Sequence, residues 1–428
     1  MKLHNSLRKH MATLFNILIR GQKWKCHARY HNHMISLVLE PFHDHANDKS
    51  LVKGKDRFGI IFHSDSGRVR YGHSPGRPSW REHILEAEAT ECRVEQANFG
   101  MPERINGQVL SRTEKTPPAS TRRRALAESR TVPSTRRKTV AFATSSHNPI
   151  VEPMMASNAS VSNGREIGDL CSACMASGSL EAGRKHLGCL INKVARDQTY
   201  ELYLVRALDE DIYPRSLQEV LMMTWSQRTR MQIPVLTRRD CLHMAATLAL
   251  NVLRLQGNWF RTEWTLQDIV LPEVVHTDVA TGRPAAQTRY SVEAPYLSWS
   301  VVDSRSENLS MSSLSVSRRS ALIKCPTLFP LGLALVELGL CRPLSEIPSQ
   351  DGDDDLDPMV AKLKKATRLL PNVLDENGGR YRDVVEECLT WPSSRPQDHD
   401  LEDSEFQRAV CQYVVLPLVN NLKAFDGE

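Results

Sequence analysis

Apolar residues recur at helical spacing near the start of this 428-residue chain. The positions within residues 1–20 are Leu3, Leu7, Met11, Leu14, Phe15 and Leu18. This spacing predicts an amphipathic helix. One isolated helix is only marginally stable in water, so its stripe needs a partner surface. We therefore expect the stripe to pack on the residues that follow, unless the chain begins inside a larger helical domain.

Shorter apolar or alternating runs predict strands. Met34–Glu40 and Phe58–His63 are strand candidates in the N-terminal part. Leu187–Asn192 and Tyr200–Val205 predict a hairpin joined by a polar turn. Arg206–Pro214 is acidic and ends in proline, so we expect it to be a connection that leaves the hairpin.

Capping signals mark two helices after the hairpin. Ser216 is placed to cap a helix that begins immediately after it. Thr237 and Asp240 have the spacing of a capping box for the helix Arg238–Leu255, and Gly257 ends that helix. The remaining, less strongly marked helices are predicted over Ile167–Met175, Met359–Leu370, Tyr381–Trp391 and Glu405–Leu422, with Pro417 disturbing the last of these.

A helix that is apolar nearly all round is predicted over Thr327–Leu340, with Thr327 as its N-cap. That pattern is typical of a buried central helix. Glu337 is the acidic residue within it, and a buried carboxylate needs a partner. We expect Glu337 to pair with Arg342 or Arg395, or to cap a nearby loop; a carboxylate in a binding site is the less favoured interpretation.

Composition divides the chain into three parts. Apolar residues make up 41% of it and the mean hydropathy is −0.38, which suggests that part of the chain stays solvated. Residues from about Pro102 to Pro149 are rich in Pro, Ser, Thr, Arg and Lys. We therefore predict an N-terminal helix and strand module over 1–95, a basic flexible linker over 96–163, and a mainly helical α+β domain over 164–428. The first part is alternatively a truncated helical domain.

The net charge of +5 is unevenly distributed. Arg122–Arg124 and Arg136–Lys138 are separated by eleven residues, a spacing that fits a bipartite nuclear import signal as well as a solvated linker. No aromatic residues are interleaved with these clusters, so nucleic-acid binding is not expected. Asp351–Asp357 is acidic but lacks the glycine and closing glutamate of a calcium loop, and is predicted to be a solvated loop.

The ten cysteines do not have the spacing of a disulfide framework, which favours an intracellular, reduced protein of the cytoplasm or nucleus. No apolar run reaches the roughly 18–20 residues of a membrane span. Two pairs, Cys171 with Cys174 and His186 with Cys189, have zinc-ligand spacing. The core is the favoured place for these cysteines, because Cys189 falls in a strand and Cys171 on the apolar side of a short helix. We expect no metal or other cofactor.

The loop Arg261–Leu271 has the length of the protein-kinase catalytic loop, His-Arg-Asp-x-Lys-x-x-Asn-Ile-x-Leu. The stretch Leu331–Leu338, followed by Arg342 and Pro343, resembles the central helix of the kinase C-lobe. Hairpin, short helix, long helix, loop and apolar helix follow in the order found in kinases, from the middle of the N-lobe onward.

The chain also resembles a fungal family of uncharacterised proteins that carry a degenerate kinase-like C-terminal domain, often behind a helical domain of the HeLo or prion-inhibition type. The residues that carry this resemblance are Trp24, Cys26, His31, Lys138–Phe142, Ile167–Cys171, Cys189 and Phe406–Leu418. The resemblance implies a reduced N-lobe hairpin followed by a mainly helical C-lobe.

The kinase resemblance places the catalytic Asp on Glu263 and the metal-binding Asn on Asp268, while the initial His becomes Arg261. The catalytic-loop Lys is replaced by Thr265, and Thr327 stands where kinases have the Asp that binds this loop. No Asp-Phe-Gly, Gly-rich loop or Val-Ala-x-Lys strand is present at the corresponding places. Losing these groups should cost many orders of magnitude in rate.

The sequence therefore predicts a pseudokinase that binds no nucleotide and acts through protein partners in signalling, for example in fungal self/non-self recognition. In this interpretation Thr327, Glu337 and Arg342 are structural anchors. Two alternatives remain. One is an atypical nucleotide-dependent phosphotransferase that uses Glu263 and Asp268. The other is a nuclear, nucleic-acid-associated protein that uses the basic linker.

Overall fold

The computed structural model describes residues 2–21, 33–40, 57–65, 80–91, 165–177, 184–192, 198–212, 214–274, 289–301, 322–348, 357–397 and 401–428. These residues belong to one unit, made from Met1–Arg93 and Gly164–Glu428. Our predictions for the basic linker, including Arg122–Arg124 and Arg136–Lys138, lie outside the described residues. The same holds for Trp24, Cys26, His31 and residues 351–356.

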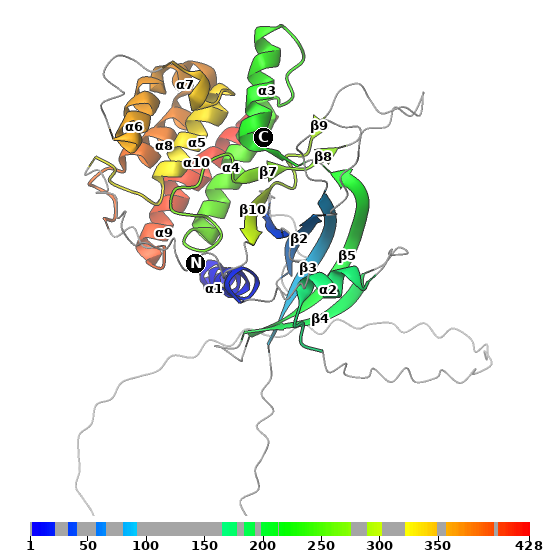
Figure 1. Ribbon diagram of the computed structural model, residues 1–428. Helices are drawn as coiled ribbons and strands as arrows, with labels where there is room; N and C mark the ends of the chain where they lie inside the picture. The colour runs from blue at the N-terminus through cyan, green and yellow to red at the C-terminus, as the bar shows by residue number, and fades with distance from the viewer. Residues whose placement is uncertain are drawn as a thin grey trace, which may run out of the picture. The chain divides into compact units, whose positions relative to one another are not determined.

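An eight-stranded sheet forms one side of this unit, and its neighbouring strands pair antiparallel (Figure 1). The strand order is β4-β5-β3-β2-β1-β10-β7-β6. The strands are β1 (His33–Val38), β2 (Arg57–Asp65), β3 (Trp80–Glu91), β4 (Lys185–Ile191), β5 (Gln198–Ile212), β6 (Arg215–Ser216), β7 (Ile269–Leu271) and β10 (Tyr296–Val301). A separate pair consists of β8 (Glu273–Val274) and β9 (Arg289–Tyr290).

The N-terminal strands lie in the middle of this sheet. Leu37 of β1 is opposite Ile60 of β2 on one side and Leu297 of β10 on the other. Strand β3 lies between β2 and β5. The division that we predicted, with residues 1–95 separate from 164–428, is therefore not the division in the structure. If the chain were divided at that point, β3 would be separated from its partner β5, and β1 from its partner β10. Each of these strands would then have unpaired backbone groups along one edge.

The predicted hairpin is confirmed as β4 and β5, but β5 is longer than expected. It continues through Arg206 to Ile212, which we had predicted to be a connection. The long neighbouring strand explains the difference, since Arg206 pairs with Ile84 and Leu208 with Glu82 of β3. Pairing with a distant segment thus overrides the local acidic composition.

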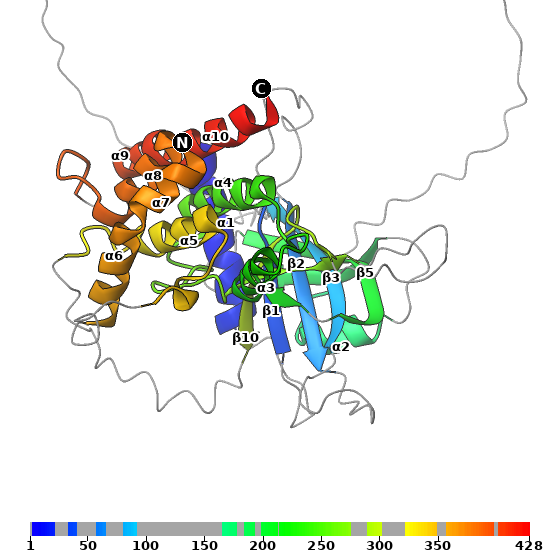
Figure 2. The ribbon, with the colours of Figure 1, turned by 90° about the horizontal axis from the view of Figure 1, so that it is seen from above.

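Most of the helices gather beside the sheet, while the short helix α2 lies near β4 and β5 (Figure 1). In Figure 2, α1 lies between the sheet and helices α5, α7 and α8. The bounds of the helices are α1 (Lys2–Phe15), α2 (Leu170–Met175), α3 (Leu217–Thr229), α4 (Arg238–Leu255), α5 (Phe329–Leu340), α6 (Pro358–Arg368), α7 (Leu370–Asn377), α8 (Gly379–Thr390), α9 (Ser404–Val410) and α10 (Leu416–Asp426). The described residues thus form an α+β fold, with an antiparallel sheet and a set of packed helices.

The capping predictions hold for two helices and fail for a third. Capping boxes are present at Ser216 for α3 and at Thr237 for α4. Helix α5, however, begins at Phe329, and Leu328 occupies its N-cap position without a side-chain hydrogen bond. Thr327 is therefore not the cap. The turn before α5 uses the backbone instead, because the carbonyl of Cys325 accepts the N–H groups of both Leu328 and Phe329.

The C-terminal helices are more broken than the sequence suggested. The helix predicted over Met359–Leu370 ends at Arg368, and α7 follows it directly. The helix predicted over Glu405–Leu422 is α9 and α10 joined by the π-helical turn Cys411–Val415. Pro417 lies in the first turn of α10, just after that turn. Proline lacks the N–H of a regular helix, so the predicted disturbance takes the form of a local π-helical turn.

Helix α1 is held by both layers of the unit. Its Arg8 donates to the carbonyl of Leu253 on α4, at 3.1 Å, and its Thr13 hydroxyl donates to the side chain of Gln198 on β5, at 2.6 Å. The Phe15 ring packs edge-on against Trp299 of β10, with ring centroids 4.9 Å apart. From Met11 onward, the apolar stripe predicted for the first twenty residues is therefore buried against the rest of the chain, as expected.

Candidate functional site

The loop Arg261–Leu271 follows α4 and ends in the short strand β7. Apolar and polar side chains alternate along it: Trp264 and Leu266 are buried, whereas Glu263 is exposed. Just before it, the Trp259 indole N–H donates to the Met11 carbonyl on α1, at 3.0 Å. These contacts fix the loop between α1 and the sheet.

Asp268 stabilises the loop from within. Its Oδ2 accepts the backbone N–H of Thr265 at 2.8 Å, and its own backbone N–H donates to the Thr265 carbonyl at 3.0 Å. Its carbonyl accepts the N–H of Ser298 on β10, at 3.2 Å. The carboxylate that the kinase resemblance places at a metal-binding position therefore closes a turn, and the backbone carbonyl of the same residue attaches that turn to the sheet.

The other two residues of the loop that the kinase resemblance singles out lie elsewhere. Arg261 is exposed, with its guanidinium over the ring of Trp299, 4.4 Å from the centroid. This stacking is a cation–π contact that holds the start of the loop on β10. Glu263 is exposed on the surface. The structure does not bring Arg261, Glu263 and Asp268 together around one cavity.

A cavity of about 380 Å³ lies beside the second half of this loop. Its wall is formed by the loop, the first turn of α3, helix α5 with the turn that follows it, and α6. The lining residues are Gln218, Trp264, Thr265, Leu266, Gln267, Pro330, Leu333, Ala334, Glu337, Leu344, Ser345, Lys362 and Lys365. Cavities that bind small molecules start at about 300 Å³, so this one is large enough to be a candidate binding site.

Glu337 is the carboxylate of this cavity. Its Oε1 accepts the backbone N–H of Leu344 at 2.8 Å, which caps the turn after α5. Burial raises the pKa of Glu337 to about 7, although the Leu344 N–H and the charge of Lys362 act in the opposite direction. Near neutral pH the group is therefore divided between its protonated and ionised forms.

Neither arginine that we considered as a partner of Glu337 binds its side chain. Arg342 stacks over the ring of Trp225, 4.3 Å from the centroid, and donates to the carbonyl of Glu346. Arg395 pairs with Glu387 on α8, at 2.7 Å. The loop-capping role predicted for Glu337 is confirmed and the arginine pairing is wrong. Arg342 nevertheless anchors the turn after α5, through its stacking.

Lys362 and Lys365 are the basic side chains among the residues that line the cavity, and Trp264 is the tryptophan among them. Lys362 is exposed and Lys365 is half-buried, on consecutive turns of α6. Trp264 is only 2% exposed, and its indole N–H has no hydrogen-bond partner among the described residues. Our sequence interpretation missed these residues, because segments more than a hundred residues apart along the chain supply the wall.

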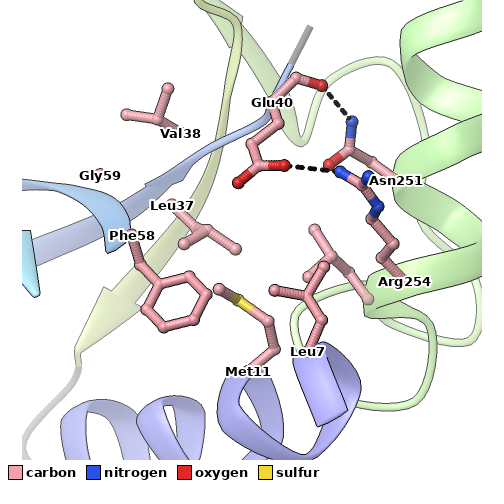
Figure 3. Close-up of a pocket in the computed structure, with 10 residues that line it drawn as sticks. Leu7, Met11, Leu37, Val38, Glu40, Phe58, Gly59, Asn251 and Arg254 are labelled. Carbon is pink, nitrogen blue, oxygen red and sulfur yellow. Dashed lines mark hydrogen bonds and ion pairs between the residues drawn. The ribbon is translucent and has the colours of Figure 1, made fainter. Parts of the chain in front are cut away.

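A second, much smaller cavity of about 30 Å³ lies where α1, β1, β2 and α4 meet (Figure 3). The carboxylate of Glu40 pairs with Arg254 at 2.6 Å, and the carbonyl of Glu40 accepts from the Asn251 side chain at 2.9 Å. The side chains of Met11 and Phe58 face these polar groups from the other side. The volume suffices for about one water molecule, so this is a structural junction.

The four residues with zinc-ligand spacing occupy different environments. Cys171 and Cys174 are buried on α2, and Cys189 is buried in β4, whereas His186 is exposed beside Tyr203. Burial raises the pKa of Cys174 to about 12, as expected for a thiol in the core. Among the described residues, no three His, Cys, Asp or Glu side chains are grouped so that they could hold a metal ion.

In the described part of the chain, every helix is too short or too polar to cross a membrane.

Comparison with known proteins gives a family and no function. No curated protein matches the sequence, and no solved structure matches it either. Residues 154–425 match the family described as "Domain of unknown function (DUF7580)", and this match covers well over half of the chain. The chain therefore belongs to the DUF7580 family.

Proposed function

We propose that this protein is a non-catalytic, kinase-like module that acts in signalling by binding partners. One observation carries the proposal. The two carboxylates at the kinase catalytic positions do not converge on the cavity beside them, because Asp268 accepts the Thr265 N–H and Glu263 lies on the surface. Phosphoryl transfer needs metal ligands and an orienting carboxylate around one reacting group.

The arrangement of the chain supports the kinase-like part of the proposal. Antiparallel strands precede a mainly helical region, and the loop Arg261–Leu271 joins a long helix to a short strand that pairs with the sheet. The apolar helix α5 packs between α4 and α8 in the centre of the helices (Figure 1). Kinases place their catalytic loop and central helix in the same order, which agrees with the sequence resemblance.

The proposal keeps the loop as a structural and binding element. The half of the loop that lines the cavity contributes Trp264 and Leu266, while Asp268 stabilises the turn behind it. We expect the partners to be proteins of the cytoplasm or nucleus. Fungal self/non-self recognition is the process that the sequence resemblance suggests.

A phosphate-transfer assay tests this proposal. Purified full-length protein is incubated with radiolabelled ATP, Mg²⁺ or Mn²⁺, and generic protein substrates, in parallel with the Glu263→Ala and Asp268→Ala variants. We expect no transfer above background, and no difference between the three proteins. Transfer at an ordinary kinase rate of about 1–100 s⁻¹, abolished by Glu263→Ala, would refute the proposal.

A further inference from the structure

Two cysteines that are far apart in the sequence meet where α4 begins and α5 ends. Cys241 lies in the first turn of α4, Cys341 is the residue that ends α5, and their Sγ atoms are 3.2 Å apart. Both side chains are buried. A disulfide bond measures about 2.05 Å, so the two sulfur atoms need to approach by only about 1 Å to become bonded.

Other contacts hold these two helix ends together. The Arg238 guanidinium, at the start of α4, donates to the carbonyl of Gly339 near the end of α5, at 2.8 Å. The same carbonyl accepts from the Asn377 side chain on α7, also at 2.8 Å. The cysteines therefore face each other across a junction that is already fixed, and a bond between them needs little movement of the backbone.

The backbone of Cys341 has an unusual conformation. Its φ of 46° and ψ of 41° are left-handed, and the turn is closed by hydrogen bonds to the carbonyls of Glu337 and Leu338. Glycine is the usual residue at this position after a helix, because a side chain there costs free energy. Strained positions of this kind gather at functional sites. At this position only a residue with a side chain can place a thiol against Cys241.

The surroundings of Cys341 favour its thiolate. The hydrogen bond from Cys241 and the charges of Arg228 and Arg238 lower the pKa of the Cys341 thiol, although burial acts in the opposite direction. By contrast, burial raises the pKa of Cys325, just before α5, to about 12. The thiolate is the nucleophilic form of cysteine, so Cys341 is the sulfur that should react first with an oxidant.

The pair lies close beneath the surface. The Arg238 side chain is 19% exposed and Arg228 is partly exposed, and these are the two cations that act on Cys341. Helix ends open locally more readily than helix centres. A peroxide is little larger than water, so opening of the first turn of α4 is enough to admit it to the two sulfur atoms.

We propose that Cys241 and Cys341 are a redox-sensitive pair that forms a reversible disulfide on reaction with hydrogen peroxide. The Cys341 thiolate attacks one peroxide oxygen, the O–O bond breaks, and the leaving hydroxide takes a proton from solvent to become water. The Cys241 sulfur then attacks the resulting sulfenic acid at Cys341. The S–O bond breaks, and the leaving hydroxide takes the Cys241 proton as the second water. Two thiols are thus oxidised by two electrons, and one peroxide is reduced to two waters.

This modification goes beyond the proposed function, because it requires no nucleotide and no partner. A disulfide that forms transiently and is reduced again by a dithiol also agrees with a protein whose cysteines lack a disulfide framework. The bond would join α4, which precedes the loop Arg261–Leu271, to α5, which lines the larger cavity.

Peptide mapping tests the proposal on the full-length protein. The reduced protein is treated with hydrogen peroxide, catalase removes the excess, and the remaining thiols are alkylated with N-ethylmaleimide in denaturant. Digestion combines trypsin with a protease that cuts after glutamate, because cleavage after Glu337 separates Cys325 from Cys341. We expect a peptide cross-linked between Cys241 and Cys341 in most molecules, and its loss after treatment with dithiothreitol.

Three variants identify the sulfur atoms. Oxidation should raise the thermal midpoint of the wild type by about 5 °C or more, because the disulfide closes a long loop. Cys241→Ser should abolish this rise, whereas the control Cys325→Ser, at another buried thiol, should keep it. Dimedone, which traps sulfenic acids, should label Cys341 in Cys241→Ser and leave Cys241 unlabelled in Cys341→Ser.

The proposal is overturned by any of three results: both cysteines carry N-ethylmaleimide after peroxide treatment, Cys341 is cross-linked to a different cysteine, or Cys341 becomes sulfinic acid without forming a disulfide. All three are read from the wild-type protein, so they do not depend on the folding of a variant. None of them bears on phosphate transfer, which is measured separately.

Discussion

Replacing the buried acid of the central helix should change how stability depends on pH. Glu337 accepts the Leu344 N–H, and burial raises its pKa from 4.5 to about 7. A folded-state pKa above the unfolded value means that the folded protein holds the proton more tightly. The resulting stability is fully present below pH 4.5 and is lost as the pH rises through 7. The Glu337→Gln variant keeps an acceptor oxygen for Leu344 but cannot ionise.

The size of the change in stability follows from the pKa shift of Glu337. The difference between 4.5 and about 7, at 1.36 kcal/mol for each pH unit, amounts to about 3 kcal/mol in the free energy of unfolding. Most of that change, about 2 to 3 kcal/mol, falls between pH 5 and pH 8. Relative to Glu337→Gln, the wild type should therefore become less stable by this amount over that range.

Urea unfolding of both proteins at pH 5, 6, 7 and 8 measures the difference. Other buried groups titrate too: burial raises the pKa of Glu82 to about 7 and lowers that of His63 to about 4. They affect both proteins alike, so the difference between the two profiles isolates Glu337. A control variant, Glu346→Gln, removes an exposed acid two residues after Leu344 and should give a profile parallel to the wild type. The reasoning would be refuted if the free energies of unfolding of the wild type and Glu337→Gln followed parallel pH profiles, within about 1 kcal/mol.

Three further substitutions test the packing by urea unfolding. Gly332→Ala on α5 should lower the free energy of unfolding by about 1–3 kcal/mol, because the added Cβ would lie 2.9 Å from a methyl group of Leu389 on α8. The control is Gly168→Ala, where the added Cβ has nothing within 4 Å and the free energy of unfolding should change by no more than about 0.5 kcal/mol. Asp268→Ala should lower the free energy of unfolding by about 1 kcal/mol, because the Thr265 N–H loses its acceptor. An equal effect of Glu263→Ala would contradict the role of Asp268 in stabilising the loop. Trp259→Phe should lower the free energy of unfolding by about 1–2 kcal/mol through loss of the indole N–H bond to the Met11 carbonyl, and an unchanged midpoint would argue against this contact between Trp259 and α1.

Local signals in the sequence predicted the helices well. The capping boxes at Ser216 and Thr237 depend on residues three positions apart, so they can be recognised without knowing the fold. Thr327 has the right type for a cap, but the backbone turn at Cys325 satisfies those N–H groups instead. A signal of this kind shows where a helix can begin, and the surrounding chain decides where it does begin.

Long-range pairing could not be predicted in the same way. The β3 sequence is rich in Glu and Ala, which favour helices, yet it forms a strand between β2 and β5. That pairing joins the N-terminal strands to the rest of the sheet. The candidate binding site has the same origin, since Trp264, Glu337 and Lys362 become neighbours only after α5 and α6 have packed. Loop capping was one of the two structural roles predicted for Glu337, but the cavity around it was not predicted.

A thermal-shift titration is the most direct test of the claim that the loop Arg261–Leu271 no longer holds a metal-bound nucleotide. The thermal midpoint of the full-length protein is measured with 0 to 10 mM ATP, with Mg²⁺ and then with Mn²⁺. With Asp268 bound to Thr265 and Glu263 on the surface, we predict no shift in the midpoint. A Kd of about 0.1 mM would instead stabilise the protein by about 2.7 kcal/mol at the highest concentration. A saturable shift of that size, lost in Asp268→Ala, would contradict the account.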